Sequence, residues 1–389
     1  MKNPGLGISF SSSVILLLAL DAYIILCPMG AAAWWVWLLF MLPSVLYIAA
    51  IARVFVFKNF KQSAFNHALW LTLTVFFPIL IFTIVSAIGA LLGLISGTFF
   101  TVFNIIGAVL AAMWLLMSLY GICFGWKRVE TDDIVLSFPN LPATFDGYTM
   151  VQLSDFHIGT YLASPSTVSA IVDKVNSLNP DLIVFTGDLV NGSASEIEPF
   201  MHDLKRLKAR DGVLSVLGNH DYCLYRRYTA PNSAEKEKSR VMELEEEAGW
   251  KLLRNQSVRI DRGSESIAVV GVENAGGKNF PDFSDLPKAL ESVPCGQFKI
   301  LLSHDPSHWR REVVPDTDIE LTLAGHTHGM QFKIGRFTPS RLGYREWGGV
   351  YQIGPHTLVV STGIGGNVAF RFGIYPQILQ ITLRRSHGC

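Results

Sequence analysis

The first third of the chain consists mainly of long apolar runs that contain very few charged residues. Four of these runs cover residues 8–27, 31–52, 68–97 and 98–125. A helix needs about 20 residues to cross the hydrocarbon core of a bilayer, and only a helix satisfies its own backbone polar groups there. The pattern therefore predicts an α-helical transmembrane bundle of about four spans within residues 1–126.

Two residues interrupt the apolar pattern. Pro78 lies inside the third run and predicts a kink or a tilt of that helix. Asp21 is the one acidic residue well inside a predicted span. Acids in membrane helices often mark functional sites, although a position near the interface or a pairing with a neighbouring helix is the simpler interpretation. No basic residue lies inside the four runs.

The basic residues of the short connections predict the orientation in the membrane. They are Lys2, Arg53, Lys58, Lys61, Lys127 and Arg128. These residues precede the first run, separate the second from the third and follow the fourth, while the other two connections carry none. Because basic residues stay on the cytoplasmic side, the pattern predicts an integral, multi-pass membrane protein whose remaining domain lies in the cytoplasm.

From residue 127 onward, short apolar runs alternate with helical stretches, as is typical of an α/β domain. We therefore predict a second domain over residues 127–389, with residues 127–133 as a linker. Its strands are predicted at residues 149–153, 182–185, 213–217, 267–272, 299–302, 321–323, 357–360 and 378–383. The charged stretch at residues 235–247 is predicted to form an exposed helix.

Charge and cysteine content exclude some classes of function. Lys and Arg together number 32, as do Asp and Glu, so the formal net charge is zero. A strongly basic nucleic-acid-binding surface is not expected, and we predict no nucleic acid partner. The five cysteines form no disulfide framework and no C-x-x-C metal pair.

Several predicted strands are followed directly by His, Asp and Asn residues. The segments are SDFH at 154–157, TGD at 186–188, GNHD at 218–221, SHD at 303–305 and AGHTH at 324–328. Each segment alone is a weak signal because Asp and Asn are common in turns. Together they supply the oxygen and nitrogen ligands that suit Mn, Fe or Zn, and binding residues gather beyond the carboxyl ends of strands in α/β sheets.

This ordered series of D-x-H, GD, GNHD, a lone His and GH-x-H resembles the calcineurin-like metallophosphoesterases and spans essentially the whole second domain. The resemblance implies a four-layer α/β/β/α sandwich that binds two divalent metal ions. It assigns one metal to Asp155, His157, Asp188 and His328. It assigns the second to Asp188, Asn219, His304 and His326. Asp188 would bridge the metals, which suits a carboxylate with two oxygens.

The resemblance also implies a reaction, namely hydrolysis of a phosphodiester or diphosphate bond by a hydroxide held between the two metals. His220 matches the family's non-ligand histidine, which protonates the departing alkoxide or polarises the phosphoryl oxygen. Asp221 would either orient His220 or act as a turn residue. The tail that begins at Tyr344 resembles a membrane-anchored phosphodiesterase branch, although Met330 stands where the family usually has a second glycine.

The substrate is less defined by the sequence than the reaction is. The second domain follows the last apolar run directly, which favours a lipid-linked or membrane-proximal phosphoester. Asn191, Arg226 and Arg227 are candidate substrate contacts, with a turn or an ordinary exposed loop as the alternative interpretation. The other candidate functions are an anchored phosphoesterase for soluble nucleotides or phosphoproteins, and a non-catalytic membrane sensor or transporter that binds a phosphoester. Oligomeric state and metal identity are not encoded in these patterns.

Overall fold

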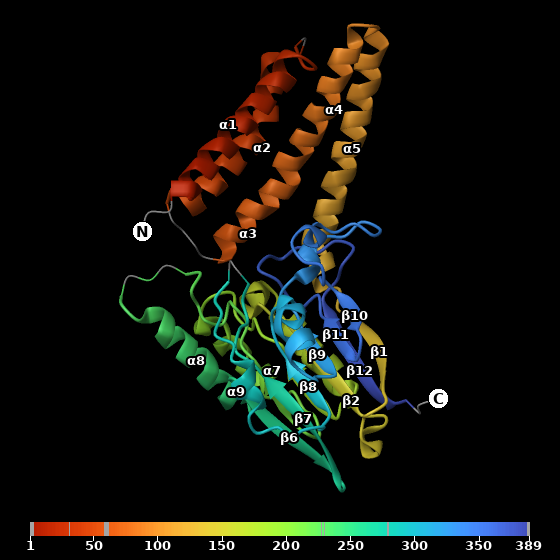
Figure 1. Ribbon diagram of the computed structural model, residues 1–389. Helices are drawn as coiled ribbons and strands as arrows, with labels where there is room; N and C mark the ends of the chain where they lie inside the picture. The colour runs from red at the N-terminus through yellow and green to blue at the C-terminus, as the bar shows by residue number, and fades with distance from the viewer. Residues whose placement is uncertain are drawn as a thin grey trace. The chain divides into compact units, whose positions relative to one another are not determined.

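The computed structural model describes residues 4–30, 32–57, 62–226, 228, 230–277 and 280–386, with the side chains of residues 4–11 and 62 left aside. The chain divides into two compact units, Met1–Phe124 and Gly125–Cys389. The first unit is helical and the second is an α/β domain (Figure 1). Each unit is described separately below.

The described residues of the helical unit form five α-helices and one π-helical turn. They are α1 (Pro4–Leu26), α2 (Trp34–Phe55), α3 (Gln62–Leu71), the π turn η1 (Thr72–Phe76), α4 (Phe77–Gly93) and α5 (Gly97–Cys123). Within the described residues, three helices are long and apolar enough to cross a membrane: Trp34–Phe55, Ser63–Gly93 and Gly97–Lys127. The described apolar part of the first helix, Ser12–Leu26, is shorter. Its passage through the membrane therefore stays a prediction.

The helix that contains Pro78 is irregular where the sequence predicts a kink. Proline has no backbone N–H, so the carbonyl of Thr74 loses its usual helical donor. The π turn η1 lies directly before Pro78 and absorbs this irregularity between α3 and α4. The distortion thus has a local cause in the sequence.

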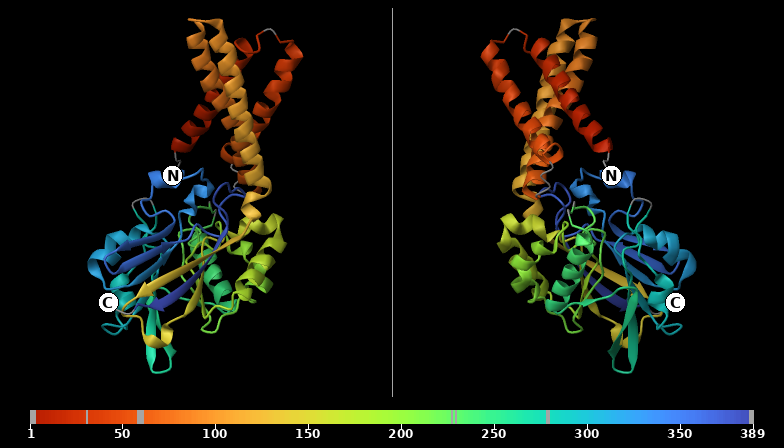
Figure 2. Two further views of the ribbon diagram at one scale, coloured as in Figure 1. Left: turned by 90° about the vertical axis from the view of Figure 1, so that its right-hand side faces the viewer. Right: turned by 90° about the vertical axis from the view of Figure 1, so that its left-hand side faces the viewer.

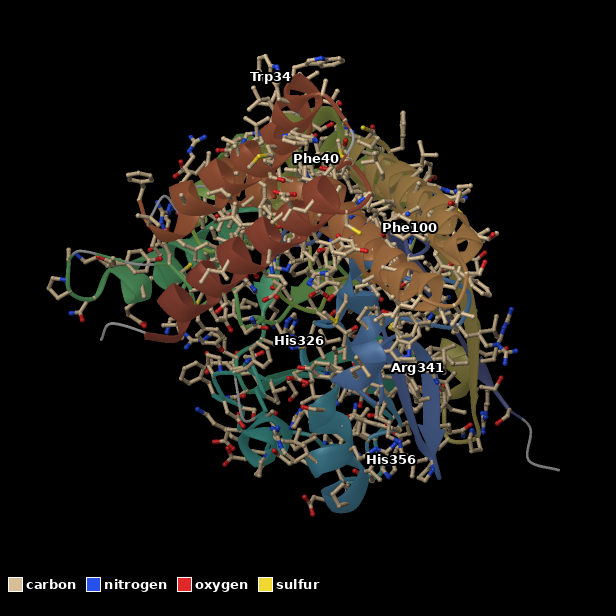
Figure 3. The ribbon with its side chains drawn as sticks, turned by 90° about the horizontal axis from the view of Figure 1, so that it is seen from above. Trp34, Phe40, Phe100, His326, Arg341 and His356 are labelled. Carbon is tan, nitrogen blue, oxygen red and sulfur yellow. The ribbon has the colours of Figure 1, made fainter. Side chains whose placement is uncertain are left out.

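The helical unit packs through small residues and presents large apolar side chains outward. A Cβ atom on Gly89 of α4 would lie 2.3 Å from the Cβ of Phe103 on α5, so this close helix contact requires glycine. Trp34, labelled in Figure 3, is 68% exposed at the start of α2. Apolar residues that face outward are expected of helices surrounded by lipid.

The α/β unit contains two six-stranded mixed sheets. The first sheet has the order β1 (Glu130–Phe138), β12 (Gln377–Arg385), β2 (Thr149–Leu153), β3 (Leu182–Phe185), β4 (Val213–Ser215) and β5 (Lys251–Leu252). The second has the order β10 (Gly349–Ile353), β11 (His356–Val360), β9 (Leu321–Ala324), β8 (Lys299–Leu302), β7 (Glu265–Gly271) and β6 (Gln256–Arg262).

Helices and short turns connect the strands. The α-helices are α6 (Pro165–Ser177), α7 (Met201–Leu204), α8 (Ser233–Glu247), α9 (Leu286–Leu290) and α10 (Val314–Asp316), with the π turn η7 (Trp309–Val313). The 3₁₀ turns are η2 (Gly125–Lys127), η3 (Ala143–Phe145), η4 (Ile158–Ala163), η5 (Ala194–Glu196), η6 (Glu198–Phe200), η8 (His328–Gln331) and η9 (Pro339–Leu342). Strands β2 to β5 run parallel with α6, α7 and α8 between them, so these helices cover one face of the first sheet.

Alternation along the strands shows how the layers pack. In β8, Ile300 and Leu302 join the core between the two sheets, whereas Leu301 packs with Trp309 on the opposite face. Because successive strand residues point to opposite faces, both faces of this sheet are covered. The predicted helical region followed by an α/β sandwich is confirmed.

Some strands were not expected from the sequence. Strand β1 begins with the polar residues that were interpreted as a linker, and it lies at the sheet edge in parallel pairing with β12 (Figure 2). Strands β5, β6 and β10 were also missed, because β5 is only two residues long and β6 and β10 are edge strands with mostly half-exposed residues. The charged helix is present as α8, although its Glu245 is buried rather than solvated.

Candidate metal centre

The predicted ligands lie on loops that leave the carboxyl ends of strands from both sheets. Asp155 and His157 follow β2, Asp188 follows β3, Asn219 follows β4, His304 follows β8, and His326 and His328 follow β9. The two sheets therefore bring together residues that lie up to 173 positions apart, counted from Asp155 to His328 (328 − 155). His326 is labelled in Figure 3.

The backbone at these ligands adopts an uncommon conformation. Positive φ angles occur at Asp155 (51°), His157 (44°), Asp188 (60°), His326 (73°) and His328 (50°). Few residues other than glycine adopt this region, and strained backbone clusters at functional sites because the surrounding structure holds it in place. With this backbone conformation, the tight loops direct their side chains toward one buried centre.

Four side chains form the first group of ligand atoms. The Nε2 atoms of His157 and His328 lie 3.2 Å apart. Nε2 of His328 is 3.3 Å from Oδ1 of Asp155. Nε2 of His157 is 3.5 Å from Oδ2 of Asp188. These are the four residues that the resemblance assigns to one metal.

The second group shares Asp188 with the first. Nε2 of His304 lies 3.2 Å from Oδ2 of Asp188. Nδ1 of His326 lies 3.2 Å from Nε2 of His304 and 2.8 Å from Oδ1 of Asn219. Oδ2 of Asp188 thus faces both groups, while its Oδ1 accepts a hydrogen bond of 2.8 Å from the backbone amide of His220.

The donor set fits a pair of divalent cations. The carboxylate and imidazole ligand atoms in each group lie within 4.8 Å of one another. Burial lowers the pKa of His157 to about 3 and holds the pKa of His328 well below its ordinary value, so both rings are neutral with a lone pair available. Burial also lowers the pKa of His304, but the adjacent Asp188 carboxylate raises it to about 10. Positive charge is therefore favoured beside Asp188.

Neighbouring groups orient the ligands. Nδ1 of His304 donates to the carbonyl of Thr186 at 2.7 Å, which leaves Nε2 free to bind a metal. With Nδ1 of His326 facing the centre, its Nε2 carries the hydrogen and donates to the hydroxyl of Tyr344 at 2.6 Å. The amide of Asn219 donates to the hydroxyl of Tyr225 at 3.0 Å and so turns its oxygen inward.

A buried arginine fixes the loop that covers Asp155. Arg371 is fully buried, and its guanidinium donates to the carbonyls of Thr362 at 2.8 Å and Gly363 at 3.0 Å and also to that of Gly365. Gly363 has a φ of 77°, and a Cβ atom there would lie 2.7 Å from the Cβ of Asp155. The sequence placed Arg371 only in the tail that resembles the phosphodiesterase branch and gave it no role, because its partners are backbone carbonyls.

His220 lies at the pocket, but Asp221 does not orient it. Nδ1 of His220 donates to the carbonyl of Asn191 at 2.8 Å, and its Nε2 lies 3.4 Å from Nδ2 of Asn367. The carboxylate of Asp221 instead accepts backbone amides from the two loops after β3 and β4, at 2.8 to 3.1 Å; these belong to Asp188, Leu189, Val190 and Gly218. The turn interpretation of Asp221 fits this geometry.

The candidate substrate contacts differ in their surroundings. The side-chain amide of Asn191 donates to Thr160 at 3.1 Å, so it helps to frame the loop that holds His220. Arg226 is exposed, and Arg227 lies outside the described residues. His308 is buried and bonded to Ser303 and Glu312, which places it in the packing behind the centre.

A pocket of about 260 Å³ opens onto the centre. Its lining residues are Asp188, Asn219, His220, Phe280, His326, Thr327, His328, Met330, Ser340, Gly343, Tyr344 and Asn367. The sequence did not single out Phe280, Asn367 or Ser340, which carry no motif of their own. The pocket therefore combines the metal ligands and His220 with apolar walls.

Comparison with known proteins shows which family this part of the chain resembles. Residues 148–330 match the family model described as calcineurin-like phosphoesterase. A transmembrane protein with metallophosphoesterase domain from Danio rerio is 28% identical over 281 residues, which cover 69% of this chain and 61% of that protein. An uncharacterized metallophosphoesterase from Aquifex aeolicus is 28% identical, covering 60% of this chain and 84% of its own. One from Bacillus subtilis is 29% identical, covering 67% and 87%.

Proposed function

Because the chain carries a calcineurin-like metallophosphoesterase domain, we propose that it hydrolyses a phosphodiester or diphosphate bond at the centre described above. The observation that carries this proposal is the convergence of two ligand groups on a single oxygen, Oδ2 of Asp188. We also propose residues 1–126 as the membrane region and residues 127–389 as the catalytic domain.

The residues of the chain have distinct roles in this reaction. Asp155, His157 and His328 would hold one cation, Asn219, His304 and His326 the other, and Asp188 both. Two bound divalent cations would supply Lewis acidity and a nucleophile derived from water; Mn, Fe and Zn all accept these ligands.

His220 is positioned to complete bond cleavage. Because its Nδ1–H is held by the carbonyl of Asn191, its Nε2 faces the pocket beside Asn367. As the phosphorus–oxygen bond to the leaving group breaks, a proton on Nε2 can pass to the departing oxygen. His220 thus acts as the acid without holding a metal.

The rim of the pocket supports a lipid-linked substrate. The segment of residues 330–345 contributes pocket residues, and it carries four basic residues and no acidic residue. Four large apolar side chains of this segment are exposed, Leu342 by 86%. They are Met330, Ile334, Phe337 and Leu342. Apolar side chains interleaved with cations suit an anionic headgroup that carries acyl or prenyl chains.

The backbone of this rim is well braced, so the exposure of its apolar side chains is part of an ordered structure. The hydroxyl of Thr338 donates to the carbonyl of Gly329 at 2.6 Å, and Ile334 pairs with Phe337 in an antiparallel bridge. Arg341, labelled in Figure 3, donates to the carbonyl of Arg336 at 3.1 Å. The segment thus presents a fixed apolar and basic surface.

The test compares two kinds of substrate in one preparation. Full-length protein in detergent, loaded with Mn²⁺, is assayed with bis-p-nitrophenyl phosphate and with a lipid-linked diphosphate in mixed micelles. We expect hydrolysis of both, and we expect Leu342→Ser and Phe337→Ser to raise KM for the lipid several-fold more than KM for the soluble diester. Val135→Ser, at a 64% exposed position on β1, is the matched control.

The other outcomes decide between the alternatives. Hydrolysis of soluble nucleotides or phosphoproteins, with no effect of the rim variants, favours the anchored enzyme for soluble substrates. Tight binding of a phosphoester by metal-loaded protein without any hydrolysis favours the sensor or transporter.

We propose that the protein crosses the membrane several times with its catalytic domain in the cytoplasm. The support is the basic residues that flank the helices, among them Arg53, Lys127 and Arg128. A reporter fused after Cys389, which lies outside the described residues, should behave as cytoplasmic. Extracytoplasmic activity of the reporter would reverse this orientation.

A further inference from the structure

Three oxygen-bearing side chains are buried in the helical unit without a hydrogen-bond partner. They are Asp21 on α1, Ser44 on α2 and Thr83 on α4, which are 1%, 1% and 7% exposed. Both carboxylate oxygens of Asp21 and the hydroxyls of Ser44 and Thr83 lack partners in the described structure. Buried polar groups are almost always paired, so three orphans in one small bundle require an explanation.

Helical spacing gives the three side chains related positions, each about one turn from a residue of one apolar cluster. An apolar cluster of this unit contains Leu17 and Tyr47, with Ile79 packed against it. Asp21 is four residues after Leu17 and Thr83 is four after Ile79, so each lies one turn further on the same helix face. Ser44 is three residues before Tyr47 on α2, which runs opposite to α1 and α4 (Figure 1). On each helix, the step from the apolar residue to the oxygen-bearing residue therefore leads toward the same end of the helical unit.

Contacts agree with this placement. The Ser44 hydroxyl is close enough to interact with the Asp21 carboxylate, but the two make no hydrogen bond of ordinary geometry. Helix α1 contacts both α2 and α4. The polar groups near these side chains, by contrast, are satisfied, because Tyr23 and Ser86 lie 3.1 Å apart and Ser86 donates to Asn104 at 2.6 Å.

If Asp21 is ionised, the three side chains carry one negative charge, and no basic side chain of the described helical unit lies beside Asp21. Arg53 is the only Lys or Arg among the described residues of the helical unit, and it lies nine residues beyond Ser44 on α2. An unpaired carboxylate in an apolar environment is costly. A proton would neutralise the charge but would leave the lone pairs of the two hydroxyls unused.

We propose that Asp21, Ser44 and Thr83 bind a small monovalent cation, Na⁺, within the helical unit. The three side chains offer four oxygen atoms, the type of ligand that hard cations take. One positive charge cancels that of the carboxylate, whereas a divalent ion would leave an excess charge in apolar surroundings. The site is independent of the phosphoesterase centre and of the function proposed for it.

Binding of Na⁺ is measured directly on the full-length protein in detergent. Equilibrium binding of ²²Na⁺ should show one saturable site, and Tm should rise with NaCl relative to choline chloride at equal ionic strength, because a ligand that binds the folded state stabilises it. Asp21→Asn should raise the Kd for Na⁺ at least tenfold and remove the Tm shift. Ser44→Ala and Thr83→Val, which keep the carboxylate, should each raise the Kd several-fold.

The controls separate this site from its alternatives. Thr101→Val, at an exposed position on α5, should leave the Kd for Na⁺ unchanged. If Asp21→Asn does not fold, the Kd values of Ser44→Ala and Thr83→Val for Na⁺ still test whether these side chains bind the ion. No saturable ²²Na⁺ binding by the wild type, or a Tm that responds to pH but not to Na⁺, overturns the proposal, and the latter result assigns a proton to Asp21.

Discussion

The two units of the protein both bury carboxylates, but they support them in opposite ways. In the α/β unit, Asp188 receives an amide hydrogen bond and lies between histidines that other groups hold in place. In the helical unit, Asp21 lies on a regular helix, and neither of its carboxylate oxygens makes a hydrogen bond of ordinary geometry with a described residue. A centre at strand ends can draw ligands and hydrogen-bond donors from several loops. A helix bundle offers only about one inward-facing side chain per turn from each helix.

From this difference we expect that the metal centre is disabled by substitution of its ligands or of the groups that orient them. The proposed Na⁺ site is instead disabled when its single ion no longer binds. Substitutions in the α/β unit should therefore fall into two groups. Some lower turnover because they remove a metal ligand or the acid, and others lower the free energy of unfolding because they remove hydrogen bonds or change the charge of a buried group. Four such substitutions test the comparison.

The largest effect is expected for Asp188→Asn. The amide keeps the size of the side chain but removes the charge that both ligand groups share, so occupancy of both metals should fall and turnover should drop by roughly three orders of magnitude. Metal analysis together with diester hydrolysis measures this. Asp173→Asn, exposed on α6, is the control, and full occupancy of both metals in Asp188→Asn would contradict the bridging role.

His220→Ala should lower turnover by about 10² to 10⁴, because it removes the proton donor but no ligand. Metal content should stay at the wild-type level, as measured by elemental analysis of protein purified without chelator. His202→Ala, on the surface of α7, should change neither quantity. Loss of metals from His220→Ala would mean that this imidazole is a ligand.

Asp221→Asn is expected to act on stability. Its carboxylate accepts amides from the loops after β3 and β4, and an amide nitrogen turned toward these donors costs about 2–4 kcal/mol. Thermal unfolding of the metal-free protein should show a lowered Tm relative to Asp261→Asn, an exposed control. If the Tm is unchanged and the pH profile of turnover is altered, the result contradicts the stability role and favours the interpretation that Asp221 orients His220.

An effect that depends on pH concerns Glu245, which is buried on α8 and whose carboxyl accepts a hydrogen bond from Ser215 at 2.5 Å. Burial raises the pKa of this carboxyl from 4.5 to about 8, with Asp221 adding to the rise. The folded protein thus keeps a proton that the unfolded chain loses. Stability should fall with rising pH between these values, by up to about 1.4 kcal/mol per pH unit.

Glu245→Gln should remove this pH dependence and unfold at a higher temperature than the wild type at pH 8. Thermal scans at pH 5 and pH 8 measure it, with the exposed neighbour Glu246→Gln as the control. An equal fall of Tm with pH in wild type and Glu245→Gln would show that Glu245 is charged in the folded state.

Much of the catalytic unit could be predicted because its signals are contiguous in sequence. The strand predicted at residues 182–185 is a short apolar run followed by a loop with a predicted ligand, and its bounds match those of β3. The edge strand β1 was missed because its polar first residues resemble a linker. Arg371 was noted only as part of the tail, and its role was not predicted, because its partners are backbone carbonyls, which leave no mark on the sequence.

The buried polar side chains of the helical unit illustrate a different limit. Asp21 could be identified as an acid within an apolar run, but Ser44 and Thr83 are ordinary helix residues in the sequence, and only the structure shows that their hydroxyls are buried without a hydrogen-bond partner. The sequence therefore identified candidate ligands that stand in short motifs at strand ends, even where these motifs lie far apart. It gave no signal for side chains that have no motif of their own, such as Ser44 and Thr83.

The hydrogen bond from the backbone of His220 to Oδ1 of Asp188 has a mechanical consequence. It joins the main chain of the loop after β4 to a side chain of the loop after β3. In the proposed mechanism, the position of the proton donor is therefore coupled to the position of the metal bridge through a single main-chain contact. A displacement of either loop would change the spacing between the acid and the metals.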